Sequence, residues 1–250
     1  MISITLPSIY PDAAARALCN IRDATRGAYQ VILVSPFKCP AGLEQNVTWV
    51  HEKEAKGCAA AHARAVESAK GEYIVAFADD HQFVAGWDEI ALSEQGDDPQ
   101  LCLGLRDVDS GHVGTNFGIF YPYFPFTRTD FCREVGWIGA DYRAGFGDSD
   151  LGMRVWSVGG RCEFSTAGLI RPTLSDKRKS GEDRPKPTYT SDDLKLFVSR
   201  WAPEYGYGWV TDRIEDFNVD LRPADNAVLC YGNTIYYNDP VFMTKIVRMV

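Results

Sequence analysis

The sequence predicts an α/β fold with a mostly parallel central sheet and flanking helices. Within the first 80 residues, short apolar segments typical of buried strands alternate with segments of helical composition. The chain has 250 residues, of which 45% are hydrophobic and 24% are charged. It can therefore bury a full core, either as one large domain or as two fused halves, and we favour the single domain.

The first 80 residues are expected to form four strands and two helices. The expected strands are ISITLP (2–7), QVILVS (30–35), NVTWVH (46–51) and EYIVAFA (72–78). The alanine-rich segment 12–26 has the length and composition of a helix, so the chain begins with a β-α-β unit. Small apolar side chains recur at helical spacing over 55–70, and Gly71 ends that helix.

The pattern changes after about residue 95. The expected elements are strands LCLGLR (101–106) and NFGIFYPYF (116–124), and helices TRTDFCREVG (127–136), DSDLGMRVWSVGG (148–160) and SDDLKLFVSRW (191–201). Residues 175–190 are charged, contain Pro and Gly, and are nearly free of apolar side chains, which predicts a mobile loop. We expect two halves (1–95 and 96–202) and a C-terminal extension (203–250) packed on the same domain.

Composition argues against several classes of protein. The net charge of -8 provides no broad basic surface for non-specific binding of nucleic acid. No apolar run approaches the roughly 20 residues that span a bilayer, and the chain starts directly in a strand, so we expect a soluble, cytoplasmic protein. The seven cysteines are dispersed and include no C-x-x-C pair, which favours reduced thiols over zinc sites or disulfides.

Two acids and a histidine follow the fourth expected strand: Asp79, Asp80 and His81. In parallel α/β sheets, ligands bind outside the carboxyl ends of the strands. Adjacent carboxylates repel each other unless a positive charge lies beside them, and Mg²⁺ or Mn²⁺ would supply that charge. The alternative is structural: Asp80 caps the next turn, and His81 is a solvated loop residue.

The spacing of motifs around these acids resembles the nucleotide-sugar half of family 2 glycosyltransferases of the GT-A fold. The matching segments are GCAAAHA from Gly57, AKGEYIV from Ala69, the acidic pair, and Gly86-Trp87. Further matches lie on both sides of this half. They are Leu6-Pro7-Ser8 at the first strand, the segment from Arg128 to Gly136, the E-D-x-D-L-x-x-R-like segment from Gly145 to Arg154, and the F-x-x-K-W-like segment from Phe197 to Trp201.

The resemblance implies that residues 1–95 form a nucleotide-sugar-binding half and residues 96–202 an acceptor-binding half. It also implies roles for particular residues. Asp148 matches the second acid of E-D-x-D and would be the general base, while Asp80, with His81 as a second candidate, would bind Mn²⁺ or Mg²⁺. Trp87 and Asp150 would contact the acceptor. The implied donor-binding residues are Pro7, Ser8, Tyr10, Ser35, Gly57, Asp79, Lys177 and Arg178.

The chain also departs from the family pattern. In an ungapped alignment Ala78 takes the place of the first acid of D-x-D, whereas a shifted alignment makes the motif Asp79-Asp80-His81. Gly147 replaces the usual Glu before Asp148. Ser35 begins the segment that replaces the acid which often binds the nucleobase, so the base is left open. The late His of the family has no equivalent near Arg171.

Asp148 and Asp150 also have a simpler explanation, because Asp at the start of a helix is commonly an N-cap. In the functional reading, a carboxylate removes the proton of the attacking hydroxyl, and a single direct displacement inverts the anomeric carbon. The environment of the two side chains distinguishes an N-cap from a general base.

The predicted function is therefore a metal-dependent, inverting, hexosyltransferase-type enzyme that moves a sugar from a nucleotide-diphosphate donor to a hydroxyl. A glycan is the default acceptor, and a modified DNA base or a protein side chain stays open. A non-catalytic protein that binds nucleotide sugars or glycans on the same fold is the alternative. A sugar-phosphate nucleotidyltransferase is disfavoured, because PSIYPD follows the first strand where a Gly-rich, basic phosphate loop would be required.

Overall fold

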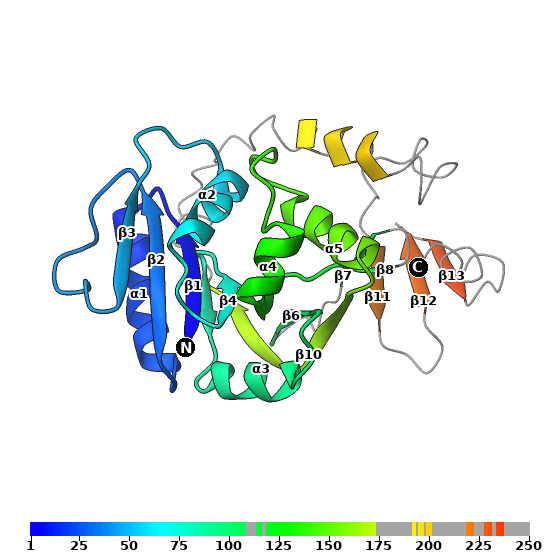
Figure 1. Cartoon of the computed structure of the whole chain (residues 1–250), viewed down its shortest axis with the longest axis horizontal. Helices are drawn as coiled ribbons and strands as arrows, with labels where there is room; N and C mark the ends of the chain where they lie inside the picture. Colours follow the sequence, from blue (N-terminus) through cyan, green and yellow to red (C-terminus); the bar gives the residue numbers. More distant parts are fainter. Residues whose placement is uncertain are drawn as a thin grey trace.

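The chain forms a large mixed sheet with helices on both faces, and a smaller second sheet (Figure 1). A computed structural model describes residues 1–108, 114–116, 119–173, 192–193, 195–197, 199–201, 219–222, 228–231 and 234–237. The expected loop 175–190, including Lys177 and Arg178, lies outside the described residues.

The large sheet has eight strands in the order β3-β2-β1-β4-β9-β6-β10-β5. Their bounds are β1 (Ile2–Pro7), β2 (Tyr29–Ser35), β3 (Val47–His51), β4 (Tyr73–Ala76), β5 (His81–Phe83), β6 (Leu101–Asp107), β9 (Pro125–Arg128) and β10 (Arg161–Pro172). Strands β3, β2, β1 and β4 are parallel, and β6 is parallel to β10. Strand β9 runs antiparallel between β4 and β6, and β5 lies antiparallel at the edge beside β10.

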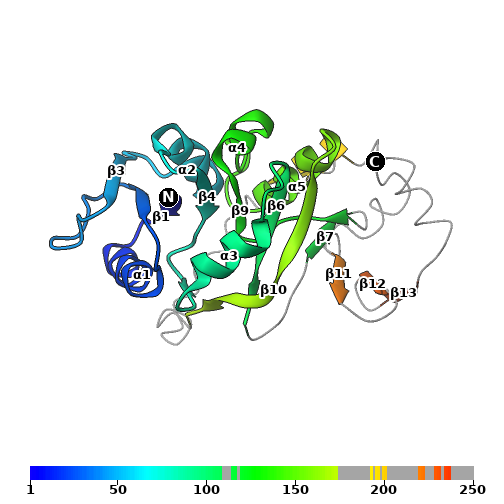
Figure 2. The same ribbon diagram turned by 60° about the horizontal axis from the view of Figure 1, so that its bottom comes forward.

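Helices cover both faces of this sheet (Figure 2). Their bounds are α1 (Pro11–Ala24), α2 (Cys58–Ala65) with the 3-10 turn η1 (Val66–Ser68), α3 (Trp87–Gln95), α4 (Thr129–Val135) and α5 (Gly147–Ser157). Buried side chains of α1 and α3 share one core cluster with β1. Those of α2, α4 and α5 form the other cluster, which also includes Phe197 and Trp201 from the helical residues between 192 and 201. The structure is therefore a three-layer arrangement.

The second sheet has the order β13-β12-β11-β7-β8. Its strands are β7 (Gly114–Asn116), β8 (Ile119–Phe120), β11 (Val219–Arg222), β12 (Val228–Tyr231) and β13 (Thr234–Tyr237). Strand β11 pairs antiparallel with β7, so described strands of the C-terminal extension lie against the middle of the chain. The boundaries at residues 95 and 202 stay a prediction.

The predicted α/β class is confirmed, and most expected elements form with shifted ends. Helix α2 starts at Cys58 rather than at residue 55, because Gly57 has φ 112°, which is not helical. The expected single strand 116–124 is wrong: β8 ends at Phe120, and β9 begins only at Pro125, a residue compatible with a strand start. None of the described helices is both long enough and apolar enough to cross a membrane.

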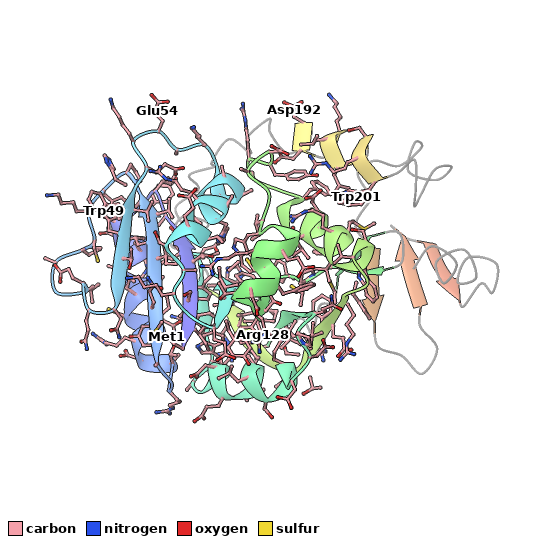
Figure 3. All side chains as sticks on the ribbon, viewed as in Figure 1. Met1, Trp49, Glu54, Arg128, Asp192 and Trp201 are labelled. Atoms are coloured by element: carbon pink, nitrogen blue, oxygen red, sulfur yellow. The ribbon has the colours of Figure 1, made fainter. Side chains whose placement is uncertain are left out.

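The carboxyl ends of the parallel strands meet on one side of the molecule. Figure 3 shows Met1, at the amino end of β1, on the lower side of the view, and Glu54, which follows β3, on the upper side together with Asp192. The polar residues after β1, β3 and β4 therefore gather at the edge of the sheet where α/β proteins bind ligands.

Candidate active site

Two adjoining cavities open at the carboxyl ends of the strands. The larger has a volume of about 860 Å³ and the smaller of about 240 Å³. Both are lined by Cys58 at the start of α2 and by Ala144 in the loop before α5, so they share a wall. The two cavities therefore adjoin at these two residues.

The larger cavity collects most of the predicted donor-binding residues. Its lining includes Pro7 at the end of β1, Ser8 and Tyr10 after it, Gly57 before α2, and Asp79 after β4. The Ser8 hydroxyl donates a hydrogen bond of 2.5 Å to Asp79 Oδ2, which joins the ends of two neighbouring strands. The structure thus brings these residues, which are distant in sequence, together in one cavity, and their role in binding the donor stays a prediction.

Ser35 is not part of either cavity wall. Its side chain is fully buried, its hydroxyl donates to Phe37 O at 2.5 Å, and Trp49 Nε1 donates to the same oxygen at 3.1 Å. With its hydrogen and an acceptor site already used, Ser35 stabilises the turn after β2. The prediction that it binds the donor is wrong.

Residues of the acidic motif after β4 line different cavities. Asp79 lines the larger cavity, and His81 lines the smaller one. The side chain of Asp80 is 53% exposed, and its Oδ1 lies 2.7 Å from His81 Nδ1. The two residues predicted to bind a metal therefore lie side by side, His81 in the wall of the smaller cavity and Asp80 exposed next to it.

This pair fits a divalent cation that is shared with a phosphate. Among the described residues, no group of three or more His, Cys, Asp or Glu side chains is arranged to hold a metal. Mg²⁺ in phosphate sites is usually bound by one or two carboxylates together with substrate phosphate oxygens, so a complete protein cage is not required. An exposed carboxylate beside an imidazole supplies the protein's share of such ligands.

Asp148 lines the smaller cavity from the first turn of α5. Its Oδ1 accepts a hydrogen bond of 2.9 Å from the adjacent Ser149 N. Burial raises the pKa of the Asp148 carboxyl, and the Ser149 bond opposes that shift. A raised pKa makes a carboxylate a stronger base, which suits proton abstraction from a hydroxyl.

The N-cap interpretation of Asp148 does not hold. The N-cap position of α5 is Phe146, at φ 60°, and no side chain makes a capping hydrogen bond there. A Cβ atom at Gly147 would lie 2.6 Å from Ile138 Cγ2 and 3.3 Å from Ala59 Cβ. This lack of space accounts physically for glycine at the position where the resembled motif has Glu.

Two further residues line the smaller cavity, Tyr123 and His62, and the sequence assigned a role to neither, although His62 lies in the GCAAAHA segment. Burial raises the pKa of Tyr123 to about 12, and the charges of Asp148 and Asp80 add to the shift. His62 Nδ1 lies 2.8 Å from Thr5 Oγ1, and burial lowers the pKa of the imidazole to about 3, which keeps it neutral. Both side chains become part of the site only through packing between distant segments.

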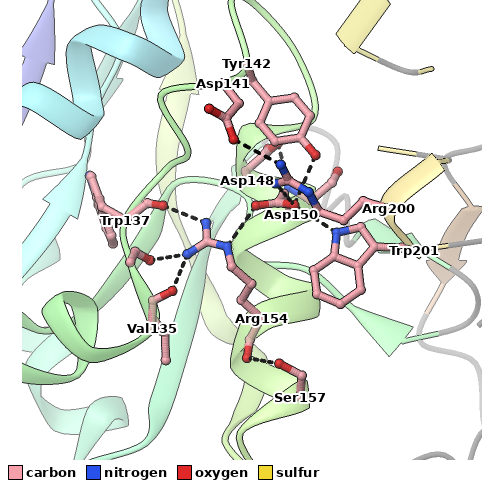
Figure 4. A network of polar contacts seen from close by, with 12 residues as sticks. Val135, Trp137, Asp141, Tyr142, Asp148, Asp150, Arg154, Ser157, Arg200 and Trp201 are labelled. Carbon is pink, nitrogen blue, oxygen red and sulfur yellow. Dashed lines mark hydrogen bonds and ion pairs between the residues drawn. The ribbon is translucent and has the colours of Figure 1, made fainter. Parts of the chain in front are cut away.

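Asp150, predicted to contact the acceptor, is instead the centre of a buried network (Figure 4). Its side chain is 1% exposed. Its carboxylate accepts hydrogen bonds from Tyr142 Oη (3.0 Å), Arg154 Nε (2.8 Å), an Arg200 guanidinium nitrogen (2.9 Å) and Trp201 Nε1 (2.8 Å). Burial alone would raise the pKa of Asp150, but the charge of Arg154 and the hydrogen bonds lower it overall. The acceptor prediction is wrong, because these partners occupy both carboxylate oxygens.

Trp87 is also misassigned by the sequence. It begins α3, is fully buried, stacks on Phe83 with ring centroids 3.9 Å apart, and donates from Nε1 to Thr25 Oγ1 at 3.1 Å. It belongs to the core cluster on the α1 and α3 face of the sheet. An acceptor cannot reach this side chain.

Asp193 holds the loop that separates the cavities, and sequence reasoning missed it. Asp193 is buried, with 3% of the residue exposed. Its carboxylate accepts hydrogen bonds from the backbone N–H groups of Arg143 (3.0 Å), Ala144 (2.8 Å) and Gly145 (2.9 Å). On the opposite side of the loop, a Cβ at Gly57 would lie 2.1 Å from Arg143 O. The loop before Asp148 is thus fixed between α2 and the helical residues near 193.

Asp193→Ala is expected to release this loop. Three backbone donors lose their acceptor, so hydrogen exchange of amides 143–145 should accelerate about tenfold or more relative to the native protein. The matched control is Asp192→Ala, because Asp192 is 74% exposed and pairs only loosely with Lys195 at 3.9 Å. Exchange by mass spectrometry or NMR measures both variants, and equal protection of 143–145 in the two would contradict the clamp.

The comparisons with known proteins agree on the architecture. The structure is similar to Staphylococcus aureus TarS (TM-score 0.57, 12% identity, 86% of this chain and 42% of that chain). It is also similar to GalNAc-T7 (TM-score 0.57, 12% identity, 69% and 44%) and to a mannosyltransferase from Pyrobaculum calidifontis (TM-score 0.55, 16% identity, 78% and 60%).

The fold is GT-A. At these identities the GT-A likeness establishes the fold alone, and no family model or curated protein sequence matches the chain. The chain spans less than half the length of TarS and of GalNAc-T7. The GT-A architecture places the two cavities and their acids at the ligand-binding edge of the sheet.

Proposed function

We propose that this protein is an inverting, metal-dependent glycosyltransferase that moves a sugar from a nucleotide diphosphate to a hydroxyl group. The observation that carries the proposal is the junction of the two cavities. The carboxylate of Asp148, with its raised pKa, lies in a small cavity that shares a wall with the larger cavity lined by Ser8 and Asp79. A base beside a donor-sized cavity is the arrangement that direct sugar transfer requires.

The structural neighbours support a nucleotide-sugar donor. TarS has been solved with UDP-GlcNAc, GalNAc-T7 with UDP, GalNAc and Mn²⁺, and the mannosyltransferase with GDP-Man and Mn²⁺. By analogy, the larger cavity takes the nucleotide, through Pro7, Ser8, Tyr10, Gly57 and Asp79. Lys177 and Arg178 remain proposed phosphate contacts from outside the described residues.

In this mechanism the chain's own groups position the reactants and take up one proton. Asp148 accepts the proton of the acceptor hydroxyl as that oxygen attacks the anomeric carbon from the face opposite the diphosphate. Asp80 and His81 would hold Mn²⁺ or Mg²⁺, whose positive charge would stabilise the departing diphosphate. Direct displacement inverts the anomeric configuration. The transferred sugar is proposed to be a hexose, and a hydroxyl of a glycan is the proposed default acceptor.

Removal of the metal tests the assignment of Asp80. With Mn²⁺ present, Asp80→Ala should weaken nucleoside-diphosphate binding about tenfold or more, because a metal ligand is lost. In excess EDTA the native protein and the variant should bind the diphosphate equally weakly. The exposed Glu89→Gln on α3, away from the site, serves as the control.

Isothermal titration measures these affinities, and turnover is followed in parallel. Full activity of the native protein in excess EDTA would refute the metal requirement. An equal loss on Asp80→Ala with and without Mn²⁺ would show that Asp80 acts without a metal.

A further inference from the structure

A buried acid lines the larger cavity at a position that the sequence motifs do not mark. Glu52 directly follows β3, and its residue exposure is 6%. Its backbone N–H donates to Ser35 O at 2.9 Å, so it lies beside the end of β2. That strand end is where the resembled motif has its base-binding acid and where this chain has Ser35. A carboxyl group is therefore present at this edge of the cavity, supplied by the neighbouring strand.

The environment of Glu52 disfavours the ionised form of its side chain. Burial raises the pKa of Glu52, while the charge of Arg64 and the backbone N–H and charge of Lys56 oppose the shift. A carboxylate offers about four acceptor positions for hydrogen bonds. Since buried polar groups cost free energy unless they are hydrogen-bonded, a buried carboxylate in a cavity wall favours a ligand that donates hydrogen bonds.

The position of Glu52 within the cavity indicates which part of a nucleotide it meets. This step rests on the proposed function, which places the diphosphate near Asp79 and Asp80. In the sheet order β3-β2-β1-β4, strand β3, which Glu52 follows, is the strand farthest from β4 and its acids. Val34 at the end of β2 and Tyr10 line the same cavity as Glu52. Val34 supplies an apolar surface and Tyr10 an aromatic ring, both suited to the faces of a nucleobase.

The edges of the four bases differ in the hydrogen-bond donors and acceptors that they present to one carboxylate. Guanine presents two adjacent donors, N1–H and N2–H, which match the two oxygens of a carboxylate in a bidentate pair. Uracil presents a single N3–H between two carbonyl oxygens, which repel the second carboxylate oxygen. Adenine and cytosine each place an unprotonated ring nitrogen beside their amino group, with the same unfavourable contact.

We propose that Glu52 selects the nucleobase of the donor and that the base is guanine. The carboxylate accepts N1–H and N2–H of guanine at the carboxyl end of β3, in place of an acid at the end of β2. The sugar donor of this protein is then a guanosine-diphosphate sugar.

The experiment compares GDP, IDP, UDP, ADP and CDP by isothermal titration with Mn²⁺ on the native chain. GDP is expected to bind most tightly. IDP lacks only the N2 amino group, and it should bind about 10- to 100-fold more weakly, the range for a lost hydrogen bond to a charged group. Because this comparison needs no substitution, it does not depend on a variant that folds.

Two variants then test whether Glu52 causes the preference for GDP. Glu52→Gln should reduce the preference for GDP over UDP to within about threefold. Glu54→Gln, an exposed acid on the same loop that lines the same cavity, should leave the preference unchanged.

The outcomes separate this inference from the proposed function. Tighter binding of UDP, ADP or CDP than of GDP overturns the guanine assignment and leaves the glycosyltransferase proposal standing. Equal binding of GDP and IDP, or a Glu52→Gln variant that weakens every diphosphate by the same factor, shows that Glu52 only supports the loop. Failure of every diphosphate to bind overturns both proposals.

Discussion

Asp148→Asn is expected to lower the turnover of sugar transfer by about 10²- to 10⁴-fold, the usual contribution of a general base. The substitution preserves size and the hydrogen bond from Ser149, but it removes the basic oxygen. The diphosphate Kd should change by less than about threefold, because Asp148 lines the smaller cavity and not the larger one. Transfer at the native rate would show that Asp148 is not the base.

The pH dependence provides a second readout for the same residue. The base must be ionised, so kcat/KM should rise with pH through the pKa of Asp148 and level off above it. Burial places that pKa above the ordinary Asp value of 3.8, so the rise should be centred above pH 3.8 in the native enzyme. The residual activity of Asp148→Asn should lack this step, and a step retained in the variant would assign it to another group.

Asp150→Ala should cost about 3 to 5 kcal/mol in the free energy of unfolding, the range for breaking a buried ion pair. The substitution leaves Arg154, Tyr142 and Trp201 without their shared acceptor. Thermal unfolding should shift by about 10 °C downwards. The matched control is Asp141→Ala, since Asp141 also pairs with Arg200 at 3.0 Å but is 68% exposed, and it should cost less than about 1 kcal/mol.

The sign of the pH effect follows from the lowered pKa of Asp150. A carboxyl whose folded pKa lies below its unfolded value of about 3.8 stabilises the protein above that pH, and loses this contribution as the pH falls through the folded pKa. The difference in stability between the native protein and Asp150→Ala should therefore shrink on acidification below about pH 4. A constant difference between pH 7 and pH 3 would contradict the ionised network.

The fold could be predicted from sequence where local patterns decide it. Buried strands β1 and β2, and helix α1, follow from apolar runs and helical composition, and the acids after β4 follow from the rule that ligands meet strand ends. Strand β9 was not expected, because it is short, begins with Pro125 and is stabilised by pairing with β4 and β6, which are distant in sequence.

The site was predicted in part for the same reason. Asp79 and Asp148 line the two cavities, because a strand end and a helix start fix their positions, and their roles stay a prediction. Trp87 and Asp150 were misassigned, since only packing reveals that one is in the core and the other is surrounded by donors. Asp193 could not have been recognised, because its partners are backbone N–H groups, which any sequence provides.

Release of nucleoside diphosphate from nucleotide sugars tests the central claim most directly. The native chain is incubated with Mn²⁺, a panel of nucleotide sugars, and glycan, duplex DNA and peptide acceptors, and the free diphosphate and the anomeric configuration of the product are measured. We expect release from at least one donor, an inverted product, and loss of both with Asp148→Asn. Binding of a nucleotide sugar without release, or a product that keeps the donor's configuration, would contradict the assignment of this GT-A chain as an inverting glycosyltransferase.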